Sequence, residues 1–126
     1  MPTGDASLPR TRRRPGVRYG GFTLIELLVV LAMAEERALA TSLTTLRSAI
    51  DQFAADRGRW PNSLAELAEL RYVRAVPPDP LTGAADTWIE VAATTPPAGG
   101  SATGGIDDVR SGAGGRGSDG RPYADW

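Results

Sequence analysis

Two hydrophobic patterns follow each other in the first half of the chain. Residues 22–34, FTLIELLVVLAMA, are predominantly apolar and carry a single charge, Glu26. After a charged triplet, large apolar residues recur at steps of four and three positions: Leu39, Leu43, Leu46, Ile50 and Phe53. This spacing places them on one face of a helix, with Arg47 and Asp51 on its solvated side. We therefore predict one helix over residues 22–57.

Local signals mark the end of this helix and the start of another. Gly58 follows the periodic pattern and suits the left-handed conformation of a helix C-terminal cap. Ser63 and Glu66 have the spacing of a capping box and predict a short helix that ends near Arg74. Its buried side is predicted to carry three leucines: Leu64, Leu67 and Leu70.

The second half of the chain has only short regular elements. Three prolines exclude helix and central strand from residues 77–83, which predicts a loop. Alternation at 87–92 predicts a strand, and 106–109 is a second candidate that can pair with it antiparallel. The tail is rich in glycine but ends in apolar Tyr123 and Trp126. The predicted fold class is α+β: a long helix and a small head with one short helix, a small sheet and an irregular C-terminal loop.

Composition excludes several kinds of chemistry. The 126 residues include no Cys and no His, so disulfides, the usual zinc sites, thiol nucleophiles and imidazole catalysis are absent. No carboxylate pair is spaced for acid–base work, and we expect no enzymatic activity. Residues 1–21 hold five Arg against one Asp, which predicts a solvated basic leader or, alternatively, a nucleic-acid-binding arm.

The order of the leader and the apolar run carries a resemblance. A secretory signal peptide has its small residues after the apolar stretch, whereas here Gly20 and Gly21 precede it. The run GFTLIELLVVLA resembles the prepilin signature of type IV pilins and type II secretion pseudopilins. That resemblance implies cleavage between Gly21 and Phe22, methylation of the new Phe22 amine, and pairing of Glu26 with the amino terminus of a neighbouring subunit. The alternative role of Glu26 is to complement the helix dipole in the first turn.

Later segments sharpen the resemblance. Residues 43–82, 86–88, 108–113 and the closing DGRPYADW are similar to the major, G-type pseudopilin of type II secretion. This implies a leader at 1–21, a helix at 22–57 and a periplasmic head at 58–126. It also implies a homo-oligomeric fibre that assists protein export. The implied partners are prepilin peptidase, other pseudopilins, the inner-membrane secretion platform and the membrane, and no nucleic acid.

The family resemblance also implies one calcium ion in the C-terminal loop. The corresponding oxygen ligands would be Asp108, Ser111, Asp119 and Asp125, a donor set that suits a hard cation. Asp, Ser and Gly are also ordinary turn residues, and that interpretation stays open.

The apolar stem departs from the family pattern. It has thirteen residues, whereas a membrane-spanning helix needs about 20. An internal piece of the stem therefore looks missing. The alternatives are a type IV pilin, a minor pseudopilin, and a periplasmic calcium-binding module that does not polymerise. The spacing of the amphipathic half also allows a coiled-coil partner.

Overall fold

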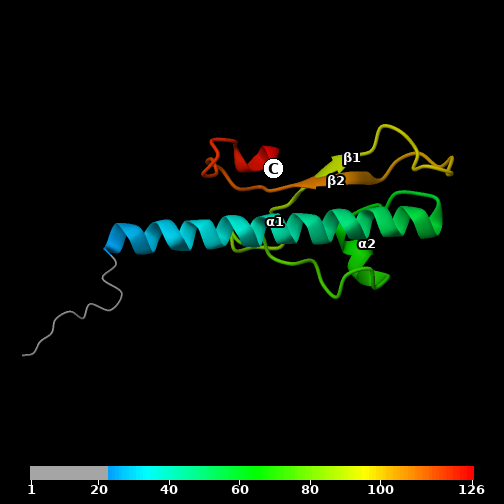
Figure 1. The fold of residues 1–126 in the computed structure, drawn as a ribbon. Helices are drawn as coiled ribbons and strands as arrows, with labels where there is room; N and C mark the ends of the chain where they lie inside the picture. The colour runs from blue at the N-terminus through cyan, green and yellow to red at the C-terminus, as the bar shows by residue number, and fades with distance from the viewer. Residues whose placement is uncertain (1–22) are drawn as a thin grey trace, which may run out of the picture. The chain divides into compact units, whose positions relative to one another are not determined.

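The computed structural model describes residues 23–126, which divide into two compact units after Ala32. Helix α1 is Leu24–Arg57 and helix α2 is Leu64–Glu69. The strands are β1, Ile89–Ala92, and β2, Ile106–Arg110, and a 3-10 turn, η4, covers Tyr123–Asp125 (Figure 1). The predicted α+β class is confirmed.

Gly58 ends helix α1 as predicted. Its φ of 69° lies in the left-handed region, and its N–H donates to the Ala54 carbonyl at 2.9 Å. Glycine takes this conformation without the steric cost that a Cβ brings.

Helix α2 begins at the predicted cap and ends earlier than predicted. Ser63 Oγ accepts the Glu66 N–H at 3.3 Å, while the Glu66 carboxylate accepts the Asn62 N–H at 2.8 Å. Its last residue is Glu69, because the chain turns there in a Schellman motif. In that motif the Tyr72 N–H donates to the Leu67 carbonyl at 2.8 Å, and the Arg71 N–H to the Ala68 carbonyl at 3.2 Å.

This early turn corrects one predicted core residue. Leu70 is 37% exposed, whereas Leu64 and Leu67 are buried as predicted. Leu70 is the C-cap of α2, so the helical face that buries Leu64 and Leu67 does not extend to it.

Arg71 adopts the strained backbone conformation that this turn requires. Its φ of 68° is the left-handed value that a side chain with a Cβ tolerates poorly. We expect Arg71→Gly to raise the free energy of unfolding by about 1 kcal/mol, because glycine takes the left-handed conformation without strain. Glycine also gives the unfolded chain more conformational freedom, which reduces this gain. Thermal denaturation of the full chain measures this, and a lower melting temperature would contradict it.

The Arg59–Glu66 pair makes stability depend on acid pH. Arg59 donates to both Glu66 oxygens at 3.2 and 2.8 Å, and this contact, followed by the Asn62 N–H, lowers the pKa of Glu66 below its ordinary 4.5. A carboxyl with a lowered folded pKa stabilises the fold above its unfolded pKa, and this is lost as pH falls through the folded value.

We therefore expect a melting temperature that falls below about pH 4.5, with a smaller fall in Glu66→Gln than in the parent chain. The exposed Glu69→Gln is the matched control and should keep the parental pH profile. Equal profiles for the parent and Glu66→Gln would contradict the assignment.

The two strands form the predicted antiparallel pair. Ile89 lies opposite Arg110 and Val91 opposite Asp108, with a register irregularity between Val91 and Ala92. Trp88, just before β1, is buried and donates its indole N–H to the Pro77 carbonyl at 2.8 Å. Through Trp88 the start of β1 is thereby joined to the proline-rich loop.

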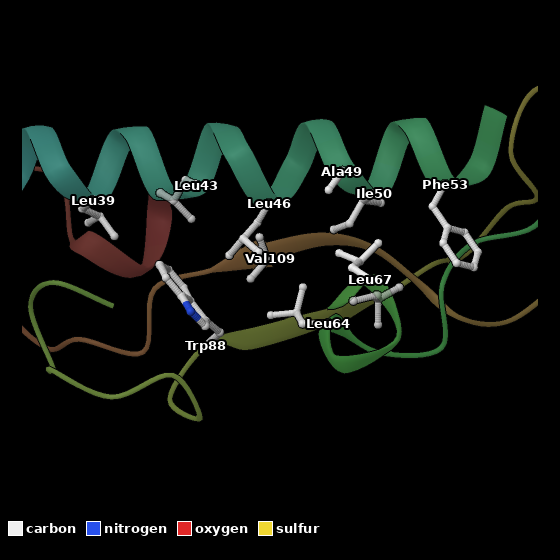
Figure 2. Close-up of a cluster of buried hydrophobic side chains, with 11 residues drawn as sticks. Leu39, Leu43, Leu46, Ala49, Ile50, Phe53, Leu64, Leu67, Trp88 and Val109 are labelled. Carbon is white, nitrogen blue, oxygen red and sulfur yellow. The ribbon is translucent and has the colours of Figure 1, made fainter. Parts of the chain in front are cut away.

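The core lies between one face of α1 and the elements of the head (Figure 2). All five predicted α1 positions are confirmed, and Ala49 joins them. Figure 2 shows these side chains directed toward α2, the strands and Trp88. The buried cluster comprises Leu39, Leu43, Leu46, Ala49, Ile50, Phe53, Leu64, Leu67, Trp88, Ile106 and Val109.

Candidate functional site

Glu26 caps the first turn of helix α1. Its Oε1 accepts the Thr23 N–H at 3.1 Å, and Thr23 Oγ1 accepts the Glu26 N–H at 3.1 Å. This reciprocal pair is a capping box, which satisfies two N–H groups that the first turn leaves open. The geometry thus gives Glu26 a capping role in the first turn, which is the turn where the alternative interpretation has it complement the helix dipole. Its pairing with a second subunit stays a prediction.

The first ten residues of helix α1, 24–33, expose apolar side chains on every side. Eight large residues are between 49% and 73% exposed: Leu24, Ile25, Leu27, Leu28, Val29, Val30, Leu31 and Met33. A helix that is apolar all round is normally covered by protein or lipid, and exposed apolar surface of this kind marks an interaction site. We call residues 24–33 the apolar segment.

Two predictions about the N-terminal region concern its processing and its ability to span a membrane. The cleavage site at Gly21 and Phe22, the methylated Phe22 amine and the leader all lie outside the described residues. Within residues 23–126, no helix combines the length and the apolar character needed to cross a membrane.

Arg47 is placed differently from the sequence prediction. It is half-buried rather than on a solvated face, because three acceptors from distant parts of the chain surround its guanidinium. Nε donates to Asp108 Oδ1 at 2.8 Å, and Nη2 donates to the Val109 carbonyl at 2.8 Å and the Trp126 carbonyl at 2.6 Å. Arg47 therefore joins α1 to β2 and to the C-terminal segment.

Glu36 holds the same C-terminal segment to α1. Its carboxylate accepts the Ser118 N–H at 2.9 Å, the Ser118 hydroxyl at 2.7 Å and the Tyr123 hydroxyl at 3.1 Å. Burial, followed by the contact with Glu36, raises the pKa of Tyr123 above its ordinary value of 10. No local pattern predicts this contact, since Glu36 precedes its partners by more than 80 positions.

The predicted calcium ligands have other partners in this arrangement. Asp108 binds Arg47 and lies 3.7 Å from Arg110 Nε, and the Arg121 contact lowers the pKa of Asp119. The Ser111 hydroxyl donates at 2.6 Å to the carboxylate of Asp79, which is buried in the proline-rich loop at residues 77–83. Asp125 lies in η4.

Across residues 23–126 no three acidic side chains gather in a way that could hold a metal. Calcium binding therefore stays a prediction from the resemblance. If it occurs, calorimetry of the full chain in detergent should show a higher melting temperature with calcium than with a chelator, and equal temperatures would remove the site.

A shallow groove lies beside the fixed C-terminal segment. It is lined by Met33, Glu36, Arg37, Ala40 and Trp126, and its volume is about 240 Å³. The α1 residues recur at steps of three and four, so they share one helix face. The groove was not expected from the sequence, because Trp126 reaches it only through the path of the C-terminal loop.

The comparison with known proteins bears on the start of the chain. Residues 17–34 match the family model described as the prokaryotic N-terminal methylation motif. The chain carries a type IV pilin-like prepilin signal. This signal implies processing by a prepilin peptidase and pilus-like assembly. No curated protein and no solved structure matches the chain.

Proposed function

We propose that the chain is the structural subunit of a pseudopilus of the type II secretion kind, of the G type. The observation that carries the proposal is the exposed apolar segment, residues 24–33, at the start of helix α1. Its eight large side chains are between 49% and 73% exposed in the single chain, so burying what remains exposed would contribute about 1 to 2 kcal/mol each. Packing against other copies removes that surface from water.

The proposed role is mechanical rather than enzymatic. Prepilin peptidase processes the chain at the inner membrane, and the head lies in the periplasm. Subunits then assemble into a fibre that promotes export of folded proteins, together with other pseudopilins and the secretion platform. The apolar segment supplies contacts between subunits, while Arg47 and Glu36 fix the C-terminal segment on the head that each subunit presents.

Processing and assembly are measured on the full chain expressed with a prepilin peptidase. Intact mass should show loss of residues 1–21 and one added methyl group, and electron microscopy should show fibres. A chain that keeps its leader contradicts processing. A fully processed chain without fibres contradicts the filament role and favours the module that does not polymerise.

Glu26 gives a sharper test within the same assay. We expect Glu26→Ala to reduce fibre yield, because it removes the only charge of residues 22–34 and the carboxylate of the capping box. Glu35→Ala is the matched control, since it removes an exposed acid of the same helix. Undiminished fibre growth in Glu26→Ala would contradict the assembly role.

A further inference from the structure

A network of side-chain contacts fixes Trp126, which forms one wall of the groove on α1. Glu36 binds Ser118 and Tyr123, and the Tyr123 and Trp126 rings pack at a centroid distance of 5.4 Å. The Arg121 guanidinium lies over the Trp126 ring, 5.5 Å from the ring centroid. A Cβ at Gly117 would overlap the indole, so the ring rests directly on the backbone there. These contacts fix the aromatic wall before any partner arrives.

Arg37 is the charge at this groove that remains open to a partner. The carboxylate of its neighbour Glu36 already accepts three hydrogen bonds. Arg37 itself is exposed, and within residues 23–126 it has no hydrogen bond or ion pair. The groove thus combines apolar walls, Met33, Ala40 and Trp126, with one available guanidinium.

The chain itself contains a segment with the complementary chemistry. The apolar segment is aliphatic on all sides and includes one charge, the acid Glu26. Glu26 uses Oε1 for the capping box, and its Oε2 accepts no hydrogen bond within the described residues. An opposite charge compensates a carboxylate placed among apolar side chains, which is otherwise costly.

We propose that the groove binds the apolar segment of a second copy of this chain, with Glu26 of that copy paired to Arg37. The inference rests on the proposed function and names the surface through which subunits meet. Two different surfaces meet in this contact, so it is heterologous, and repeating it extends an open filament rather than closing a dimer. The ion pair selects the register, while Trp126 and Met33 cover aliphatic side chains.

Cysteine crosslinking tests the contact directly, because the chain has no Cys of its own. Val30→Cys lies one helical turn beyond Glu26, and Ala40→Cys lies about one turn beyond Arg37. Oxidation of the processed full chain that carries both substitutions should give a ladder of multimers on a nonreducing gel. The control pairs Val30→Cys with Ala38→Cys, an exposed alanine of α1 that does not line the groove.

Charge reversal tests the ion pair. We expect Arg37→Glu to lower fibre yield about tenfold, the effect of a 1.4 kcal/mol loss per contact, while cleavage stays complete. Arg71→Glu reverses an exposed charge away from the groove lining and should keep parental yield. Trp126→Ala should lower the yield, and Trp126→Phe should retain it, since phenylalanine keeps an aromatic wall. Circular dichroism confirms that each variant is folded.

The outcomes separate this inference from the proposed function. Fibres that form normally in Arg37→Glu, or equal crosslinking at positions 38 and 40, overturn the groove contact and leave the filament role standing. A parent chain that is processed but forms no fibres overturns both. The ladder together with the loss in Arg37→Glu supports the contact.

Discussion

Replacing Phe53 by alanine should lower the free energy of unfolding by about 4 kcal/mol, the largest effect of a single substitution that we expect. Phe53 is fully buried and its ring packs on Tyr72 at a centroid distance of 5.2 Å. The guanidinium of Arg59 lies 4.8 Å from the ring centroid and that of Arg57 lies 5.4 Å from it. The substitution therefore removes apolar burial and two cation–π contacts together.

Urea denaturation of the full chain in detergent measures this effect. Leu70→Ala is the informative control, because helical periodicity predicts Leu70 to be buried whereas the structure leaves it 37% exposed. That variant should lose less than about 1 kcal/mol. Equal losses for the two variants would contradict the burial of Phe53 and the partial exposure of Leu70.

Arg47→Ala should cost about 2 to 3 kcal/mol, although Arg47 is a charged residue that the sequence places on a solvated face. Hydrogen bonds from charged donors contribute about 1.5 to 3 kcal/mol, and partial exposure reduces the contribution of the ion pair. The substitution removes the donor that Arg47 supplies to Asp108 and to the carbonyls of Val109 and Trp126. Thermal denaturation should show the loss.

Two further variants identify the cause. Arg47→Lys keeps the charge but lacks the fork that reaches three acceptors, so it should be intermediate. A double-mutant cycle with Asp108→Ala should give a coupling energy of about 1 kcal/mol, because the two side chains share one contact at 2.8 Å. A loss within about 0.5 kcal/mol for Arg47→Ala would contradict its role as a link between α1 and the C-terminal segment.

Some parts of the candidate site were predicted from the sequence and others were not. The prepilin-like motif and the helix dipole assigned roles to Glu26, whereas the capping box that Glu26 forms with Thr23, three residues before it, was not predicted. The groove at Trp126 and the partners of Glu36 were not predicted at all. Asp108, Ser111 and Asp119 were proposed as calcium ligands on resemblance. The structure pairs them with Arg47, Asp79 and Arg121, and calcium binding stays a prediction.

The sequence by itself determined the elements whose causes act over a few residues. Helical periodicity defined the buried face of α1, Gly58 its end, and Ser63 the start of α2. Side-chain spacing and capping depend on neighbours within about four positions, so a linear pattern records them.

Only the tertiary structure decided which polar groups meet. Arg47 and Asp108 are separated by 61 positions, and Glu36 and Ser118 by 82. Such contacts depend on how the strands pair and how the C-terminal loop returns to α1. No local pattern encodes the path of that loop, because many loop conformations satisfy the same turn residues and only packing on the core selects among them.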